Sequence, residues 1–375
     1  MTELPLTFYE FFAGGGMARL GLGEAWTCAF ANDFDPVKAA TYRANFPDAE
    51  RHLHEGDVGA LEAGDLPGRV DLAWASSPCQ DLSLAGARAG LEGGRSGAFF
   101  GFWRLISSLA REDRAPRTVV IENVCGLATS NDGRDFIALC QALSAQGYRF
   151  GALEIDAAAF VPQSRPRLFV VAHAGEPPRA LVGTSPFHTR GVKAAQGRLP
   201  AGLAKHWVWW RLAAPPARNT NLAALLEPDD AVVWHSERVT ERWLDLMGPL
   251  HRQRLAAQTG RAVGAAFRRT RVEHGQRVQR AEARFDGLAG CLRTPRGGSS
   301  RQALVVVEND QVRTRLVTPR EAARLMGLSD RYRLPAGTTD GLAVTGDGVV
   351  APVVRWLARE LLEPLAGRSA KAEAA

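Results

Sequence analysis

Short apolar runs alternate with stretches of helical periodicity over the first 175 residues of the chain. Five of these runs are predicted to be β-strands, because each is bounded by turn residues and is too short for a helix. They are Leu6–Phe12, Cys28–Ala31, Val70–Ala75, Thr118–Ile121 and Leu168–Ala172. Strands that alternate with helices predict an α/β fold with a doubly wound, mostly parallel sheet.

Polar and glycine-rich clusters adjoin these strands. The first four strands are followed by the turn Gly14-Gly15-Gly16, by Asn32-Asp33, by Ser76–Cys79 and by Glu122-Asn123. The fifth strand is preceded by Gln163–Arg167. In open α/β sheets, ligands bind beyond the carboxyl ends of the strands. These clusters therefore mark the edge of the sheet where a site is expected.

After Gly175 the pattern changes, with Pro177-Pro178, Pro186 and Pro215-Pro216 interrupting the chain. The predicted organisation is a first domain at 1–175, a second, smaller domain at 176–302 and a C-terminal segment at 303–375 that returns to the first.

Regular structure returns in the C-terminal segment. Alternation at Ala303–Val307 resumes the strand pattern. Thr318 is predicted to cap a helix that has Pro319 in its first turn and an acid in its second. Residues 351–365 carry a helical apolar face that should pack on the first domain. The tail from Gly367 is expected to fray.

Composition indicates a folded protein. Of its 375 residues 46% are hydrophobic and 23% charged, which excludes wholesale disorder. No apolar run approaches the ~20 residues of a membrane span, and the N-terminus shows no signal peptide. Five cysteines without a Cys-x-x-Cys pair argue against a disulfide framework or a zinc site. A reducing, cytoplasmic location is therefore expected.

The net charge of +6 is unevenly distributed. Residues 176–290 contain 18 Lys and Arg against 10 Asp and Glu, and five of the nine Trp, whereas the rest of the chain is slightly acidic. Arginines clustered with aromatic residues are typical of a nucleic-acid partner. A solvated basic face around a small core fits the charge equally well.

The glycine turn and the acid after the second strand suit a nucleotide-like ligand. Glycine lets a ligand approach the backbone closely, and Asp33 stands where an acid would bind ribose hydroxyls. Phe34 beside it is suited to pack on an adenine, although taken alone it is more typical of a core residue.

Cys79 follows Pro78 in a strand-to-loop turn, where a thiol is held out at the sheet edge. Such a thiol becomes a nucleophile when positive charge or helix N–H groups stabilise its thiolate. The other four cysteines, Cys28, Cys125, Cys140 and Cys291, are expected to be buried and inert. Residues 81–97 are rich in Gly and Arg and are expected to form a loop that closes over a substrate.

A nucleophilic Cys, a carboxylate and two arginines meet a specific chemical demand. To alkylate carbon 5 of cytosine, an enzyme must first add a nucleophile to carbon 6, because the ring itself is a poor nucleophile. A carboxyl group must then hold ring nitrogen 3 and the exocyclic amine, and a cation must hold oxygen 2. The base must also leave the duplex stack.

With these residues, the sequence resembles the S-adenosylmethionine (AdoMet)-dependent cytosine-5 DNA methyltransferases of bacterial and phage type. The resemblance covers most of the chain in the family's linear order. It rests on Phe12–Gly16, Asn32–Asp35, Gly56–Val58, Pro78–Gln80, Glu122–Val124, Gln163-x-Arg165-x-Arg167, Thr318–Gly327 and Gly346–Val349 with Pro352-Val353. The implied fold is a Rossmann-like methyltransferase domain with a smaller target-recognition domain in the basic, Trp-rich segment.

The resemblance implies roles for individual residues. Cys79 would be the nucleophile, Glu122 would engage nitrogen 3, and Arg165 and Arg167 would position the base and the loop. The implied AdoMet site consists of Phe12, Ala13, Gly14, Gly16, Asp33, Phe34, Asp57, Val58, Pro78, Asp347 and Val349. The implied contacts to double-stranded DNA are Gln80, Ser83, Arg88, Arg95, Arg293, Arg296, Gly297, Gly298, Ser299 and Arg301. No metal is implied.

Two positions depart from the family pattern. Asp33 stands where Glu is usual, and Asp347 stands where Asn is usual. A carboxylate at 347 would either help the amino group of AdoMet or repel its carboxylate. The sequence leaves that choice open.

Three alternatives compete with DNA methylation. A tRNA methyltransferase of the same fold usually has a small recognition region and a Cys-Phe-Thr signature, which this chain lacks. A catalytically silent, AdoMet-sensing DNA-binding regulator has no need of Cys79, Glu122, Arg165 and Arg167 together. A dinucleotide dehydrogenase is disfavoured because the full Gly-x-Gly-x-x-Gly pattern is missing. We expect a monomer, with a restriction endonuclease as a possible cognate partner.

Overall fold

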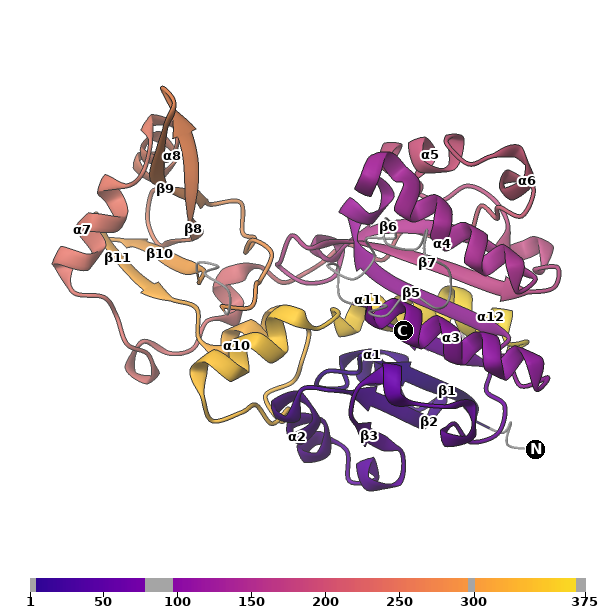
Figure 1. The fold of residues 1–375 in the computed structure, drawn as a ribbon. Helices are drawn as coiled ribbons and strands as arrows, with labels where there is room; N and C mark the ends of the chain where they lie inside the picture. The colour runs from indigo at the N-terminus through magenta and orange to yellow at the C-terminus, as the bar shows by residue number, and fades with distance from the viewer. Residues whose placement is uncertain (1–4, 78–96, 296–300, 369–375) are drawn as a thin grey trace. The chain divides into compact units, whose positions relative to one another are not determined.

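The computed structural model describes residues 5–77, 97–295 and 301–368 (Figure 1). Packing divides the chain into two compact units. Unit 1 comprises Met1–Ile155, Pro166–Pro216 and Val349–Ala375, and unit 2 comprises Asp156–Arg165 and Ala217–Gly348. The first part of the basic segment, through Pro216, thus packs within unit 1. The functional domain bounds given above stay a prediction.

Unit 1 is built on a seven-stranded sheet. Its strands are β1 (Leu6–Phe11), β2 (Trp26–Asp33), β3 (Leu53–Glu55), β4 (Leu72–Ala75), β5 (Thr118–Val124), β6 (Tyr148–Asp156) and β7 (Pro166–Ala174). They lie in the order β3-β2-β1-β4-β5-β7-β6. Neighbours from β3 to β5 are parallel, and β5 pairs antiparallel with β7. The predicted doubly wound, mostly parallel α/β fold is confirmed.

The helices of unit 1 cover this sheet. They are α1 (Met17–Leu22), α2 (Pro36–Asn45), α3 (Ala98–Arg111), α4 (Arg134–Ala145), α5 (Arg190–Gly197), α6 (Ala201–Ala204), α11 (Ala351–Leu357) and α12 (Glu363–Leu365), with a π-helical turn at Ala358–Leu362. The main core lies where α3 and α4 pack on the central strands, with Phe102, Leu139 and Ile121 fully buried. Parallel strands covered in this way read as continuous apolar runs, which explains why they could be predicted.

All five predicted strands of the first domain are present, and β3 and β6 were missed. The predicted C-terminal helix is confirmed as α11 and its continuation. It packs on α1 so closely that a Cβ atom at Gly21 would lie 2.3 Å from the Cβ of Val354.

Unit 2 contains a separate antiparallel sheet in the order β11-β10-β8-β9. Its strands are β8 (Ala262–Glu273), β9 (Gln276–Arg284), β10 (Ala303–Glu308) and β11 (Gln311–Leu316). Its helices are α7 (Glu237–Asp245), α8 (Pro249–Ala256), α9 (Pro319–Leu325) and α10 (Thr338–Asp347). A small core gathers Trp243, Met247, Ala266, Ala281 and Val305. The predicted strand at Ala303–Val307 is confirmed as β10.

The predicted start of α9 is confirmed in detail, with one correction. Thr318 caps the helix and Pro319 stands in the first turn, but Glu321 also lies in the first turn rather than the second. There its carboxylate accepts from the backbone N of Thr318, which closes a capping box. The same carboxylate forms a fully buried ion pair with Arg315.

One helical stretch, Thr338–Leu365, is long and apolar enough to cross a membrane by length and composition alone. Within the structure 72% of its most apolar window is buried, as in the core helices of globular proteins.

Candidate active site

The glycine turn after β1 is held by its backbone conformation. Phe12, Gly14 and Gly16 have φ angles of 58°, 56° and 78°, which lie in the left-handed region. The backbone N of Ala13 donates to the carbonyl oxygen of Asn32 (2.9 Å), so the turn is tied to the end of β2. At Gly14 a Cβ atom would meet nothing within 4 Å, whereas at Gly16 it would lie 2.2 Å from the Phe46 ring. Gly14 thus leaves an open approach to the backbone, and Gly16 is required for packing.

Asp33, at the end of β2, binds this turn directly. Its Oδ2 accepts from the backbone N of Gly14 (2.8 Å), and its Oδ1 accepts from the backbone N of Asp35 (2.9 Å). Burial raises the pKa of Asp33. The next side chain, Phe34, is 70% exposed, so the interpretation of Phe34 as a core residue is wrong.

The turn after β3 carries Asp57 and Val58. Asn32, which is 1% exposed, donates from Nδ2 to the carbonyl oxygens of His54 (3.1 Å) and Gly56 (2.9 Å). The Asp57 side chain is exposed and accepts from the backbone N of Gly59 (2.8 Å), while Val58 is buried. Asn32 is a positioning residue that sequence reasoning missed; its signal was a polar residue at the end of a buried strand.

Glu122 and Arg167 form an ion pair at the same edge of the sheet, with Nε of Arg167 3.2 Å from Oε1 of Glu122. The register pairs Glu122 with Phe169 and Val124 with Arg167. Glu122 and Arg167 are therefore diagonal neighbours on one face of an antiparallel pair. The side chains are only 8% and 16% exposed, which strengthens their attraction.

Asn123 anchors the point at which the chain leaves β4. Its Nδ2 donates to the backbone oxygen of Ser77 (3.0 Å) and to the Ser77 hydroxyl (3.2 Å). Ser77 is the last described residue before the segment that carries Cys79. Neither residue was assigned this role from the sequence, although Asn123 adjoins the predicted acid.

The two arginines of the predicted motif have different partners. Arg167 lies with Glu122 in unit 1, whereas Arg165 lies in unit 2. The Arg165 guanidinium donates to the carbonyl oxygens of Leu292 (3.0 Å), Gly346 (2.8 Å) and Gly348 (2.7 Å). Gln163 acts similarly, because its Nε2 donates to Leu325 O (2.8 Å) and its Oε1 accepts from Leu292 N (3.0 Å).

The remaining predicted residues are distributed as follows. Asp347 is exposed in unit 2 and accepts a hydrogen bond from the Thr294 hydroxyl, while Val349 is buried in unit 1. Arg293 is exposed and Arg301 is half-buried in unit 2. Pro78, Cys79, Gln80, Ser83, Arg88, Arg95, Arg296, Gly297, Gly298 and Ser299 lie outside the described residues.

A buried carboxyl group was not anticipated from the sequence. Glu10 in β1 is 1% exposed; its Oε1 accepts from the backbone N of Arg19 (3.3 Å), and its Oε2 has no hydrogen-bond partner among the described residues. Burial raises the pKa of Glu10 to about 8.

The other four cysteines only partly match the expectation of burial. Cys28 and Cys140 are buried as predicted, whereas Cys125 and Cys291 are half-buried, which corrects that expectation. Burial raises the pKa of Cys28 to about 12. The thiolate of Cys28 is thus disfavoured at neutral pH.

Together these groups define a class of protein. The end of β1 offers an open glycine turn, and the end of β2 offers a buried acid and an exposed aromatic ring. The facing ends of β5 and β7 add a carboxylate beside a guanidinium. This is the arrangement of a nucleotide-binding α/β enzyme of the doubly wound class.

Comparison with known proteins identifies the family. A model described as C-5 cytosine-specific DNA methylase matches residues 6–363. The chain therefore belongs to the C-5 cytosine-specific DNA methylase family, whose members depend on AdoMet.

Individual relatives agree over nearly the whole chain. The chain is 26% identical to the type II methyltransferase M.NlaX of Neisseria lactamica, covering 96% of this chain and 97% of that protein. It is 25% identical to the type II methyltransferase M1.ScrFI of Lactococcus lactis subsp. cremoris, covering 95% and 78%. The crystal structure of S. pombe Dnmt2 methyltransferase has the same fold (TM-score 0.62, 18% identity, 96% and 99% covered).

Proposed function

We propose that the protein transfers a methyl group from AdoMet to carbon 5 of a flipped-out cytosine in a specific sequence of double-stranded DNA, with Cys79 as the nucleophile. The observation that carries the proposal is the Glu122–Arg167 ion pair beside the end of β4. A carboxylate and a guanidinium in contact can address two neighbouring polar edges of one flat base.

The proposed reaction balances as follows. The Cys79 thiolate adds to carbon 6, and the electron pair moves toward carbon 5, which becomes nucleophilic. Glu122 binds nitrogen 3 and the exocyclic amine, while Arg167 binds oxygen 2 as negative charge develops. The methyl group would come from AdoMet, which would leave as S-adenosylhomocysteine. Carbon 5 then gives its proton to a water molecule and the thiolate leaves carbon 6, so the aromatic ring is restored. Arg165 acts through the segments that it binds.

The turns after β1, β2 and β3 offer groups that suit the parts of AdoMet. When bound, AdoMet supplies an electrophilic methyl group. The open backbone at Gly14 would admit its amino-acid portion, and the exposed ring of Phe34 would cover its adenine, with Asp57 and Val58 at the other edge. Asp33 would reach the ribose less readily than Glu, because both its oxygens bind backbone N–H groups.

The DNA partner is proposed from the family and from charge. Arg293 and Arg301, with the segment 296–299, are assigned to contacts with the duplex. The relatives are named type II methyltransferases. On that ground we assign the enzyme to a restriction–modification system. We also propose that it acts as a monomer, because one active site and one recognition domain suffice for the reaction. Plasmid DNA from cells that express the enzyme should then resist a restriction endonuclease that cleaves the same recognition sequence. Gel filtration should give the mass of one chain.

The direct test is nucleoside mass spectrometry. Unmethylated duplex DNA and, separately, unmodified tRNA are incubated with AdoMet and either the wild-type protein or Cys79→Ser. The proposal predicts 5-methylcytosine in DNA with the wild type alone, and sequencing the product then gives the recognition sequence. Product in tRNA alone would support the tRNA methyltransferase, and binding of DNA without any product would support the silent regulator.

A further inference from the structure

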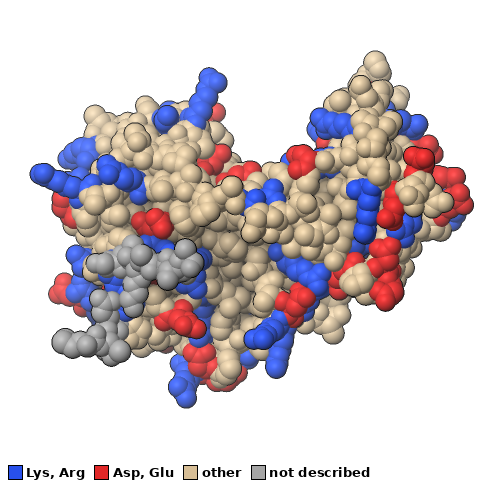
Figure 2. Space-filling model, turned by 180° about the vertical axis from the view of Figure 1, so that it is seen from behind, with Lys and Arg blue, Asp and Glu red and all other residues tan. Residues whose placement is uncertain are grey.

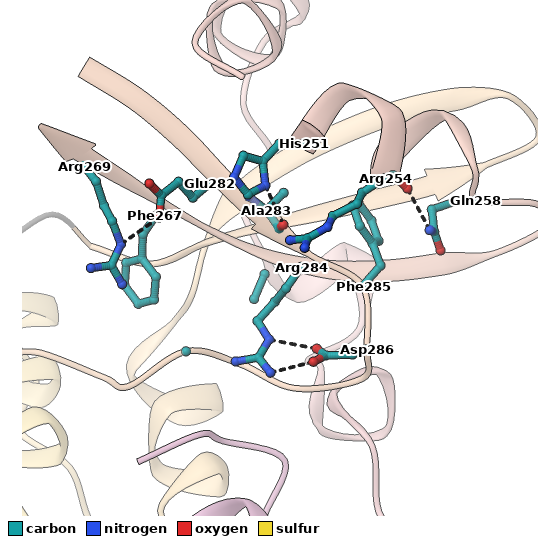
Figure 3. A pocket seen from close by; sticks show the side chains of 12 residues that line it. His251, Arg254, Gln258, Phe267, Arg269, Glu282, Ala283, Arg284, Phe285 and Asp286 are labelled. Atoms are coloured by element: carbon teal, nitrogen blue, oxygen red, sulfur yellow. Dashed lines mark hydrogen bonds and ion pairs between the residues drawn. The ribbon is translucent and has the colours of Figure 1, made fainter. Parts of the chain in front are cut away.

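A cavity of about 590 Å³ lies in unit 2 between α8 and the β8–β9 hairpin (Figure 3). Its volume falls within the ~300–1,000 Å³ typical of ligand sites. Helix α8 contributes His251 and Arg254, the hairpin contributes Phe267, Arg269 and Arg284, and Phe285 follows β9. We call this cavity the α8–β9 pocket. None of its residues was assigned a function from the sequence or by family resemblance.

The pocket holds arginines of two kinds. Arg269 is paired with Glu282 (3.2 Å), and Arg284 is paired with Asp286 (2.8 and 2.5 Å). These acids orient the two guanidinium groups; Asp286 pairs with Arg284, whereas Glu282 is shared between Arg269 and Arg271. Arg254 differs, because no described residue forms an ion pair or hydrogen bond with its guanidinium. In Figure 3 its side chain extends from α8 toward His251 and Ala283.

Two aromatic rings make the pocket partly apolar. Phe267 and Phe285 are both half-buried and line the cavity. Each ring lies against a glycine: a Cβ atom at Gly290 would lie 2.3 Å from Phe267, and one at Gly264 would lie 2.5 Å from Phe285. Glycines at these points let the rings sink against the backbone. A basic surface that is only solvated would not require glycines that allow aromatic rings to pack so closely on the backbone.

The positive charge and the apolar rings of the pocket together favour one class of ligand. The charged residues that line the pocket carry a net positive charge. Arg254 is the lining arginine without an acid partner among the described residues, and its charge suits the single negative charge of a phosphodiester. Apolar rings beside that charge suit the carbon face of a sugar. More than half of protein–DNA hydrogen bonds reach phosphate and sugar rather than bases.

We propose that the α8–β9 pocket binds the sugar–phosphate backbone of the substrate duplex, with Arg254 on a phosphate and Phe267 and Phe285 against the adjoining deoxyribose. This inference rests on the proposed function, in which duplex DNA is the substrate. A backbone contact of this kind fixes the position of unit 2 along the duplex without reading the sequence.

The test compares Arg254→Ala with Arg242→Ala in the full-length protein. Arg242 is an exposed arginine on α7 that does not line the pocket, so both variants lose one positive charge. Dissociation constants are measured at several salt concentrations, for a duplex with the methylated sequence and for one without it. Arg254→Ala should weaken binding of both duplexes equally, by about tenfold, since hydrogen bonds to charged groups are strong. It should also reduce the salt slope by about 1.

Two further variants separate charge from shape. Arg254→Lys should keep the salt slope, because a lysine still neutralises the phosphate. Phe285→Leu should weaken binding and leave the slope unchanged, because no charge is lost. Thermal melts check that each variant folds.

If Arg254→Ala and Arg242→Ala change the dissociation constants and the salt slope equally, the proposal that the pocket binds the DNA backbone is overturned. A loss confined to the methylated sequence would mean that Arg254 reads a base, which also overturns a backbone contact. A wild-type protein that fails to bind duplex DNA would instead refute the proposed function, so the two failures are distinguishable.

Discussion

Glu122 and Arg167 come together through strand register rather than through sequence proximity. They are 45 residues apart, yet the antiparallel pairing of β5 and β7 makes them diagonal neighbours. Asn123, the next residue of β5, points to the other face and binds Ser77. One short stretch of β5 thus supplies both a candidate catalytic carboxylate and the side chain that holds Ser77 just beyond β4.

Replacing Glu122 by Gln should separate binding from chemistry. The amide keeps the size of the side chain but cannot act as an acid or support the positive charge of Arg167. We expect the rate of methyl transfer to fall by about 10²–10⁴-fold, the range of a lost general acid. Single-turnover kinetics and DNA titration check this. A variant with an unchanged rate would remove Glu122 from the mechanism.

Glu10 makes stability depend on pH. Burial raises its pKa from 4.5 to about 8, so between these values the folded protein holds a proton that the unfolded chain has lost. The contribution of this bound proton to the free energy of unfolding is fully present below about pH 4.5 and is lost as pH rises through 8. The free energy of unfolding then falls by at most ~1.4 kcal/mol per pH unit.

Glu10→Gln should therefore remove a fall in the free energy of unfolding between pH 5 and 8. Urea denaturation of both proteins across this range measures it. Because the amide brings its own unsatisfied group, the comparison is of the slopes and not of the absolute stabilities. Parallel pH profiles would show that Glu10 is not protonated in the folded state.

At the scale of elements, two glycines in the turn after β1 have different roles. Gly14 faces open space, and Gly16 faces the ring of Phe46. Both have positive φ, so any side chain is strained there by about 1–2 kcal/mol.

Gly16→Ala should lower the free energy of unfolding by about 3 kcal/mol or more, because overpacking adds to that strain. Gly14→Ala should cost much less stability and instead raise the dissociation constant for AdoMet. Urea denaturation and calorimetric titration measure the two effects. If both variants lose stability equally with unchanged AdoMet affinity, Gly14 does not face the cofactor.

The elements also show how far a sequence can be interpreted. β4 is apolar throughout, and β1 and β5 are mainly apolar, because helices cover both faces of the sheet, so these strands could be predicted. β6 contains Gly151, which weakens the strand pattern. Glycine is required there because a Cβ atom would lie 1.9 Å from the carbonyl oxygen of Val208, and such a contact cannot be predicted from the sequence.

The β8–β9 hairpin was missed for another reason. Its outer half is mostly exposed on both faces and is rich in Arg, so it has no hydrophobic period. The turn at His274-Gly275, with φ angles of 49° and 79°, is what a tight two-residue hairpin requires and was the available signal. Likewise, the motif residues at the strand ends could be predicted, whereas the burial of Glu10 and the anchoring role of Asn32 depend on packing.

At the scale of the whole molecule, positive charge is interspersed with acids on the face that Figure 2 shows and along the β8–β9 hairpin. On the face seen in Figure 2, Lys and Arg alternate with Asp and Glu rather than forming one continuous patch. The hairpin shows the same pattern, since Arg269 and Arg271 both pair with Glu282, and Arg280 pairs with Glu273. Affinity for DNA then depends on those cations that phosphates can reach.

DNA binding should still weaken steeply with salt, because each neutralised phosphate releases condensed counterions. Between 50 and 200 mM salt we expect the affinity to fall by more than about tenfold, with a linear dependence of log K on log salt. Fluorescence anisotropy with a labelled duplex measures the slope. A flat dependence would contradict a phosphate-based interface.

The central claim is that Cys79 attacks carbon 6 of a cytosine in duplex DNA. It is tested most directly by a duplex with 5-fluorocytosine at the methylated position. There carbon 5 carries fluorine in place of the proton that must leave, so the thiolate cannot be expelled and the adduct persists. With AdoMet, the wild-type protein should form a stable one-to-one complex under denaturing conditions, and peptide mapping should place the DNA on Cys79. Cys79→Ser should form none. An adduct on another cysteine, or efficient methylation by Cys79→Ser, would contradict the account.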